Sequence, residues 1–378
     1  MWFIFRPDAV NVWKNKEVLK RYQRYRGILD GAKKARYLLV KRMPIDCSLE
    51  KDTLEELWAE HERLAEEFPK LLRKLNGDQI TLDELPAHKK SFLELKEEIA
   101  WRILRNCHFC ERRCGIDRSK GEIGVCRVGQ ETIVSSAFLH TGEESVLVPS
   151  GTIFFAGCTF KCAFCQNYDI SQEWKTKNQP SMTAGVVTDA KRLSLLEEQL
   201  WKEGAKNINF VGGDPTPNLH TIIASLKYLQ ANITLLWNSN NYQSLEATKL
   251  LLELMDFWLP DFKFWENDFA KKISGVDNYR EIVSRNIKLA YEAGSGEVLV
   301  RHLLMPGRVE ADTIPILEWC AKEIPNAMVN LMDQYHPDYL IIRQPDKYRA
   351  LNRRILPEEW KRATKKADEL GIFWRPVS

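Results

Sequence analysis

The sequence has no apolar run near the ~20 residues that a membrane-spanning helix needs, and it has no internal repeat or low-complexity tract. Its formal net charge is only +3, which is too small by itself to predict a nucleic-acid or membrane partner. The apolar residues 1–5 are too few for the core of a signal peptide, and Arg6 and Asp8 follow them at once. These absences predict a cytoplasmic protein with no membrane partner.

The length of the chain and the positions of its cysteines are more informative about its fold and chemistry. A chain of 378 residues with a 44% hydrophobic share is long enough for a large globular domain and an appendage. Nine cysteines are present, and all but Cys47 and Cys320 fall between positions 107 and 165. Clustered thiols in a reducing compartment favour metal ligation over disulfides. We expect the two isolated cysteines to be small buried hydrophobes.

The first hundred residues predict helices. Apolar residues recur at helical spacing from 54 to 75, Asn76-Gly77 ends the pattern, and Pro69 is a point where the helix could kink or split. The basic, tyrosine-rich run 20–26 has two interpretations. It could contact RNA, or it could be a helix whose tyrosines pack inward and whose charges pair with the acidic segment 51–100. Cationic clusters on helices are common, so the second interpretation is favoured.

From residue 150 onward, short apolar runs alternate with helical patterns, which predicts parallel βαβ units. The fold class is therefore α/β, with a partial or full (β/α) barrel. We divide the chain into a helical N-terminal extension (1–104), a four-cysteine module (105–149) and a barrel core with C-terminal helices (150–378). The expected strands are 152–156, 207–211, 233–237, 257–260, 298–304 and 328–331, and the expected helices are 190–203, 219–230, 244–255, 279–293 and 312–323.

Three cysteines follow the first expected barrel strand with the spacing C-x3-C-x2-C: Cys158, Cys162 and Cys165. Three thiolates on one compact loop can bind three irons of a [4Fe–4S] cluster and leave the fourth iron without a protein ligand. The alternatives are a zinc site that lacks one ligand and three unrelated core cysteines. A zinc site would usually show its fourth ligand nearby, and two close spacings in one loop make coincidence a poor explanation.

This loop resembles the hallmark of the radical S-adenosylmethionine (SAM) superfamily. Four further blocks resemble its pyruvate formate-lyase activating enzyme-like branch, and two more resemble an uncharacterised iron–sulfur subgroup of that branch. The resemblance covers the chain from about residue 105 to the end. The blocks are 150–155, 165–167, 259–263, 301–307, 330–335 and 352–355.

The resemblance implies an oxidoreductase that cleaves SAM reductively at a [4Fe–4S] cluster and forms a 5′-deoxyadenosyl radical for hydrogen abstraction. An electron donor such as flavodoxin or ferredoxin would reduce the cluster. A protein glycine is the first substrate that the resemblance suggests. RNA, suggested by the basic run, and a small molecule are the other substrate classes. A zinc-stabilised binding protein without radical activity is the alternative from a different class, and iron analysis separates it from the enzyme.

Polar residues follow the next expected strands, at the end where β/α barrels build their active sites. Gly212, Gly213 and Asp214 resemble the family's Gly-Gly-Glu motif, in which the glycines let the backbone approach SAM and the acid meets the SAM ammonium. A simple Gly-Gly turn is the alternative. Asn238 and Ser239 could bond the ribose or the methionyl carboxylate of SAM.

Asp261 and Lys263 are two residues apart and face one way if the chain is extended. By resemblance they support the SAM carboxylate and the reacting centre, and we list them as catalytic; a rim ion pair is the alternative. The resemblance also directs Arg301 at SAM. His302 is more often a satisfied core histidine than a catalyst.

A second cysteine group precedes the barrel: Cys107, Cys110, Cys114 and Cys126. Four thiolates fit a second [4Fe–4S] cluster or a closed zinc site, with a redox disulfide as a further possibility. In activating enzymes with extra clusters the added cysteines follow the three-cysteine loop, so their earlier position here does not by itself predict a glycyl-radical target. Residues 140–144 could line the substrate cavity or cap a turn.

Overall fold

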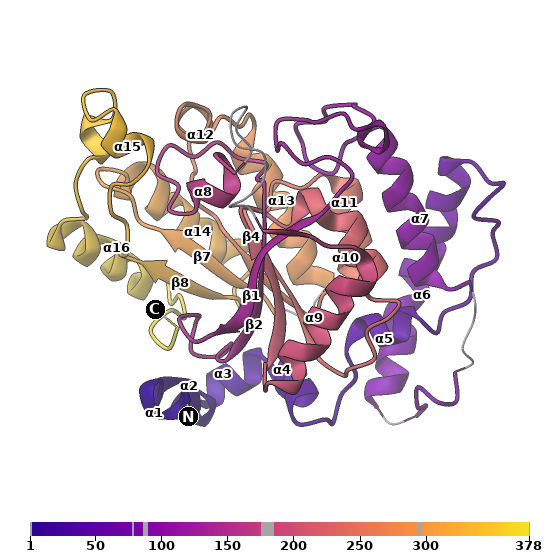
Figure 1. Cartoon of the computed structure of the whole chain (residues 1–378). Coiled ribbons are helices and arrows are strands. Elements are labelled where there is room, and N and C mark those ends of the chain that lie inside the picture. Colours follow the sequence, from indigo (N-terminus) through magenta and orange to yellow (C-terminus); the bar gives the residue numbers. More distant parts are fainter. Residues whose placement is uncertain (1, 78, 86–89, 175–184, 294–296, 378) are drawn as a thin grey trace.

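A computed structural model describes residues 2–77, 79–85, 90–174, 185–293 and 297–377 (Figure 1). An α/β barrel lies at the centre, with helices outside its strands, as the sequence predicts. The strands are β1 (Ile133–His140), β2 (Ser150–Phe155), β3 (Val186–Val187), β4 (Asn207–Gly212), β5 (Thr234–Ser239), β6 (Phe257–Pro260), β7 (Leu299–Leu303) and β8 (Met328–Met332).

The sheet shows that the barrel is partial. One sheet has the order β3-β1-β2-β4-β5-β6, and a second pairs β7 with β8. Parallel bridges from Trp258 to Val298 and from Asp261 to Arg301 connect β6 to β7. Among the strand pairs of the described chain, none joins β8 to β1 or β3, so the barrel stays open between those edges. All six predicted strands are confirmed, whereas β1, which runs antiparallel to β2, was not predicted.

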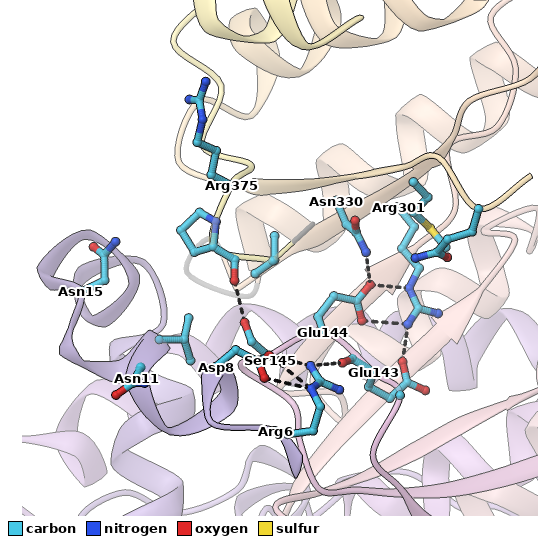
Figure 2. A pocket seen from close by; sticks show the side chains of 16 residues that line it. Arg6, Asp8, Asn11, Asn15, Glu143, Glu144, Ser145, Arg301, Asn330 and Arg375 are labelled. Atoms are coloured by element: carbon cyan, nitrogen blue, oxygen red, sulfur yellow. Dashed lines mark hydrogen bonds and ion pairs between the residues drawn. The ribbon is translucent and has the colours of Figure 1, made fainter. Parts of the chain in front are cut away.

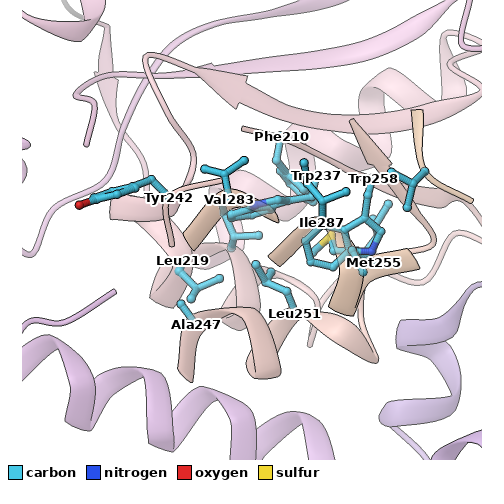
Figure 3. Close-up of a cluster of buried hydrophobic side chains, with 14 of the residues drawn as sticks. Phe210, Leu219, Trp237, Tyr242, Ala247, Leu251, Met255, Trp258, Val283 and Ile287 are labelled. Carbon is cyan, nitrogen blue, oxygen red and sulfur yellow. The ribbon is translucent and has the colours of Figure 1, made fainter. Parts of the chain in front are cut away.

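Helices cover the outer face of the strands. In Figure 3, Trp237 and Trp258 from neighbouring strands lie against Leu251 and Ile287 from two covering helices, and all four are 0–1% exposed. Burying side chains of this size contributes about 2–3 kcal/mol each relative to exposure. The longer helices are α3 (Lys16–Arg21), α4 (Gln23–Leu29), α5 (Arg36–Val40), α6 (Leu54–Asn76), α7 (Phe92–Arg105), α9 (Ala190–Lys202), α10 (Leu219–Ser225), α11 (Leu245–Leu252), α12 (Asn267–Ser274), α13 (Tyr279–Ala293), α14 (Ile314–Glu323) and α16 (Pro357–Glu369).

Four short α-helices complete the set of α-helices in the described part of the chain. The long helix α6 runs unbroken through Pro69, so the proline does not split it. Buried hydrophobic side chains form one cluster that extends from α5–α7 into the barrel. The packing is therefore not interrupted at the boundaries that we place at residues 104 and 149. No helix of the described residues is long and apolar enough to cross a membrane. The short helices are α1 (Trp2–Phe5), α2 (Asp8–Asn11), α8 (Tyr168–Ser171) and α15 (Leu340–Arg343).

The basic run 20–26 packs against the barrel where its strands begin. Tyr22 and Tyr25 are fully buried, and their rings lie 5.0 and 5.3 Å from the ring of Phe257, the first residue of β6. The inward packing of the tyrosines is therefore confirmed. The expected charge pairing was wrong in detail, because buried Arg24 pairs at 2.8 Å with Asp256 of the barrel rather than with an acidic residue of segment 51–100.

Replacing Asp256 with alanine is expected to lower the free energy of unfolding by about 3–5 kcal/mol. Asp256 is fully buried, and one oxygen accepts hydrogen bonds from the Arg24 guanidinium and from the Arg36 amide. Asp30→Ala is the matched control, because its exposed pair with Arg26 is worth only about 0.3–0.5 kcal/mol. Urea denaturation measures both, and equal losses in the two variants would contradict the expected role of Asp256.

Candidate active site

The three-cysteine loop lies over the carboxyl end of the parallel strands. Cys158 and Cys162 are buried and Cys165 is half-buried, directly after β2. All three line a cavity of about 260 Å³, which the ends of five more parallel strands, β4 to β8, complete. The other lining residues are Phe160, Phe164, Gln166, Asn167, Val211, Gly212, Gly213, Asn238, Ser239, Asn240, Asp261, Lys263, Arg301, Leu303, Met332 and Gln334.

The three thiols influence one another. Burial raises the pKa of Cys162 to about 12, and Cys165 adds to this rise because two neighbouring thiolates repel. Burial also raises the pKa of Cys158, and Asp214, Cys162 and Cys165 raise it further. A cationic iron site would offset this repulsion and favour the thiolates. The donor set therefore fits an iron–sulfur cluster.

Among the described residues, no three Cys, His, Asp or Glu side chains are grouped so as to hold one metal ion. The cysteines of a cubane cluster each bind a different iron, so their sulfur atoms stand farther apart than the ligands of a single ion. Two serine hydroxyls reach the sulfur atoms: Ser274 Oγ lies 3.1 Å from Cys162 Sγ, and Ser171 Oγ lies 3.2 Å from Cys165 Sγ.

Replacing Ser274 with alanine is expected to make the reduction potential of the bound cluster about 40 mV more negative. A hydroxyl that donates a hydrogen bond to sulfur stabilises the reduced, more negative cluster by roughly 1 kcal/mol, which corresponds to about 40 mV for one electron. An EPR-monitored redox titration measures the shift. Ser284→Ala on the outer helix α13 should leave the potential unchanged, and an unchanged potential in Ser274→Ala would show that the hydroxyl does not donate to the cluster.

Gly212, the last residue of β4, and Gly213 let the backbone pass close to the cysteine loop. Gly212 has φ +131°, and a Cβ on Gly213 would lie 2.2 Å from the carbonyl oxygen of Gly157. The amide of Asp214 donates to that same carbonyl at 2.9 Å. Glycine is therefore required here for the contact between the β4 turn and the cysteine loop.

Asp214 is not among the residues that line the cavity. Its buried carboxylate accepts hydrogen bonds from the amides of Thr216 at 2.8 Å and Asn240 at 3.3 Å. Burial raises its pKa to about 6. The carboxylate thus connects the turn after β4 to the end of β5, and the predicted contact with the SAM ammonium stays a prediction.

Four other predicted residues do meet in the cavity. Asp261 and Lys263 form an ion pair with each other, and both also line the cavity. An ion pair and a place in the candidate site are therefore compatible for these two residues. Asn238 and Ser239 line it from β5. The buried Nδ2 of Asn238 has no hydrogen-bond partner in the described part of the chain, which leaves it as a donor for a ligand.

Arg301 also lines the cavity, and two neighbouring glutamates hold it there (Figure 2). Glu144 accepts from Arg301 at 2.6 and 2.7 Å, and Glu143 forms a further ion pair with its guanidinium. Burial of the Glu143 carboxyl raises its pKa, but the charges and hydrogen bonds of Arg301 and His140 together outweigh burial and lower the pKa to about 2. From the sequence alone, residues 140–144 could line the substrate cavity or cap a turn; the structure places Glu143 and Glu144 inside the barrel, against Asn209 of β4, Arg301 of β7 and Asn330 of β8.

His302 is a satisfied core histidine. Its Nδ1 lies 2.7 Å from the carbonyl oxygen of Phe262, and its Nε2 lies 2.9 Å from Thr313 Oγ1. Burial lowers its pKa. Both ring nitrogens therefore have protein partners.

The four-cysteine module packs directly against the three-cysteine loop. Burial raises the pKa of Cys110, and Cys126, Cys107 and Cys114 raise it further, so the four thiols lie near one another. The Arg112 guanidinium of the module donates to the carbonyl of Thr159 at 2.5 Å. All four cysteines are free thiols rather than disulfides. The module and the loop thus form one continuous structure.

Comparisons with known proteins agree with this geometry. Residues 152–320 match the family described as the Radical SAM superfamily. The chain is 39% identical over 349 residues to the uncharacterized protein MJ0674 of Methanocaldococcus jannaschii, and the match covers 92% of this chain and 97% of that protein.

Solved structures show weaker similarity. The chain matches Streptococcus suis SuiB bound to S-adenosylmethionine with 15% identity and a TM-score of 0.38, over 56% of this chain and 44% of SuiB. It matches native anSMEcpe with bound AdoMet with 14% identity and a TM-score of 0.35, over 57% of each chain. This chain therefore spans less than half of SuiB.

Proposed function

Because this chain belongs to the radical SAM superfamily, we propose that the cysteine-lined cavity holds a [4Fe–4S] cluster and SAM and starts radical chemistry on a substrate. The observation that carries the proposal is the set of three buried thiols on one strand-end loop, facing a cavity that polar groups from neighbouring strand ends complete. When bound, the reduced cluster supplies one electron that splits SAM into methionine and a 5′-deoxyadenosyl radical.

The residues of this chain divide the work. Cys158, Cys162 and Cys165 would hold three irons of the cluster, which would leave the fourth iron for SAM. Asn238 Nδ2, which has no partner among the described residues, donates to SAM from β5, and Ser239 lies beside it. The backbone at Gly212 and Gly213 closes on SAM from β4. These contacts orient SAM toward the iron and exclude water from the reacting bond.

Lys263 and Asp261 act together at the reacting centre. The ammonium of Lys263 offsets the negative charge of the SAM carboxylate, and Asp261 holds that ammonium in place through their ion pair. Arg301 lies at the inner wall of the same cavity, where Glu143 and Glu144 fix its guanidinium. The polar side chains that follow successive strands thereby surround one reacting position.

The pyruvate formate-lyase activating enzyme-like branch is the finer assignment, supported by sequence blocks such as 259–263 and 301–307. Within it, a protein glycine is one candidate substrate. The RNA alternative rested on run 20–26, and the tyrosines of that run are buried against the barrel, where they offer bases no stacking surface. A small molecule is the third substrate class, and a second cavity next to the cysteine-lined one supports it.

The four-cysteine module is proposed to hold a second [4Fe–4S] cluster that passes electrons from a flavodoxin or ferredoxin to the first. Its packing through Arg112 onto the three-cysteine loop supports this role, and a structural zinc ion is the alternative. Metal analysis of Cys107→Ala separates the two: loss of about four irons per chain supports the cluster, and loss of one zinc supports the structural site.

The proposed function is tested by anaerobic reconstitution with iron and sulfide, reduction with dithionite and addition of SAM. Equal amounts of 5′-deoxyadenosine and methionine are expected, with neither formed when dithionite is omitted. A protein that holds zinc without iron and forms neither product would instead be a binding module, and the enzyme assignment would be wrong.

A further inference from the structure

A second cavity, of about 600 Å³, lies beside the cysteine-lined cavity (Figure 2). Arg301, Met332 and Gln334 line both cavities, so the two cavities adjoin at these side chains. The second cavity lies at the open edge of the barrel, between β8 and the loop that follows β1. Its volume is within the range of about 300–1,000 Å³ that small-molecule sites occupy.

Both ends of the chain help to build this cavity. Its floor is buried and comprises Glu143, Glu144 and Asn330, whereas Asn11 and Asn15 of the N-terminal helices form an exposed rim.

Two contacts hold the loop after β1 under that rim. Arg6 donates to the carbonyl groups of Thr141 and Glu143, and Ser145 Oγ donates to the carbonyl of Pro376 at 2.6 Å. The result is a cavity that opens to solvent at the rim and ends at the side chains that it shares with the cysteine-lined cavity.

The floor of the cavity has an excess of negative charge. Glu143 and Glu144 share one guanidinium, that of Arg301. The other two arginines that line the cavity have carboxylate partners of their own, because Arg6 pairs with Asp8 and Arg375 pairs with Asp368. His140 is a further group near the floor, with its Nδ1 3.2 Å from Glu143 Oε1. Two carboxylates against one guanidinium favour a cationic ligand.

We propose that this second cavity binds the substrate of the radical reaction, and that the substrate is a small polar molecule with a primary ammonium group. The proposal rests on the proposed function. The ammonium faces Glu143 and Glu144, and the carboxamides of Asn11, Asn15 and Gln334 bond hydroxyl or carbonyl groups of the same molecule. One hydrogen atom passes from a substrate carbon to the 5′ carbon of the deoxyadenosyl radical, and the substrate keeps the unpaired electron.

The test compares probes of equal size on the reconstituted protein with SAM bound, by ligand-observed NMR. The probes are 4-amino-1-butanol, 1,4-butanediol and 4-hydroxybutyrate, with N-acetylglycinamide as a neutral mimic of a protein glycine. The cationic probe is expected to bind about tenfold more tightly than the diol, and 4-hydroxybutyrate is expected to bind most weakly.

Glu143→Gln is expected to abolish the tenfold preference. The oxygen of the new amide can still accept the hydrogen bond that Asn209 Nδ2 donates to Glu143 at 3.0 Å, so the variant loses a charge more than a hydrogen bond. Asn11→Trp, at the exposed rim, is expected to weaken all the probes by covering the entrance. Glu55→Gln on the surface of α6 is the control and should bind like the parent.

A cationic probe that binds no more tightly than the diol would overturn the proposal. A preference that survives Glu143→Gln would place the binding elsewhere and would also overturn it. Tighter binding of N-acetylglycinamide than of the amine would favour a protein glycine instead. None of these arms needs SAM cleavage, so a failure of the proposed function is seen separately, as the absence of 5′-deoxyadenosine.

Discussion

Cys158→Ala, Cys162→Ala and Cys165→Ala are each expected to lose about four irons per chain and to reduce SAM cleavage by about 10³-fold or more. A cluster held by only three protein ligands has no spare thiolate, because the fourth iron is reserved for SAM. The three positions act as a unit, so a double variant should be no worse than a single one. Iron analysis and chromatography of 5′-deoxyadenosine measure both effects.

Cys47→Ala is the matched control, because Cys47 is a half-buried free thiol outside both cysteine groups. It should keep the iron content and the activity of the parent. A Cys162→Ala variant that retained its iron and cleaved SAM at the parental rate would remove the three-cysteine loop from the mechanism.

Gly213→Ala is expected to lower SAM cleavage by about 10²-fold. The added Cβ would lie 2.2 Å from the Gly157 carbonyl oxygen and 2.9 Å from Ser171 Cβ. The turn after β4 and the cysteine loop must then move apart, and a displacement of about 1 Å in an active site can cost that much in rate. Rates at saturating SAM, together with SAM titrations, show whether binding or chemistry is lost.

Gly129→Ala is the control for that substitution, because a Cβ at Gly129 meets no atom within 4 Å. It should retain the rate of the parent. Equal rates in Gly213→Ala and the parent would mean that close contact between the two loops is not needed.

The sequence predicted the barrel because its core strands are continuous apolar runs, buried on both faces, as at Phe210 and Trp237. It missed β1, in which only Val134 is buried and the other residues are half-buried or exposed, and which falls in the segment taken for the cysteine module. Strand pairing, rather than local pattern, decides the fate of such a segment.

Some residues of the candidate site could likewise be predicted from the sequence and others could not. The cysteines and the polar residues at strand ends are visible in the sequence because each follows a recognisable strand. The pairing of Arg301 with Glu143 joins positions 158 residues apart, and nothing local marks it. Asp214 is a different case: its place in a familiar motif suggests a ligand contact, which stays a prediction, and no local pattern shows that its carboxylate accepts hydrogen bonds from two backbone amides.

On the proposed function, the cluster on Cys158, Cys162 and Cys165 leaves one iron to which SAM binds directly. Electron–nuclear double resonance on the reduced protein, with SAM carrying ¹⁵N in its amino group, detects such binding. We predict a hyperfine coupling from ¹⁵N that is present in the parent and absent from Cys162→Ala. A fully loaded, reduced cluster with SAM bound but without that coupling would show that SAM does not bind the iron.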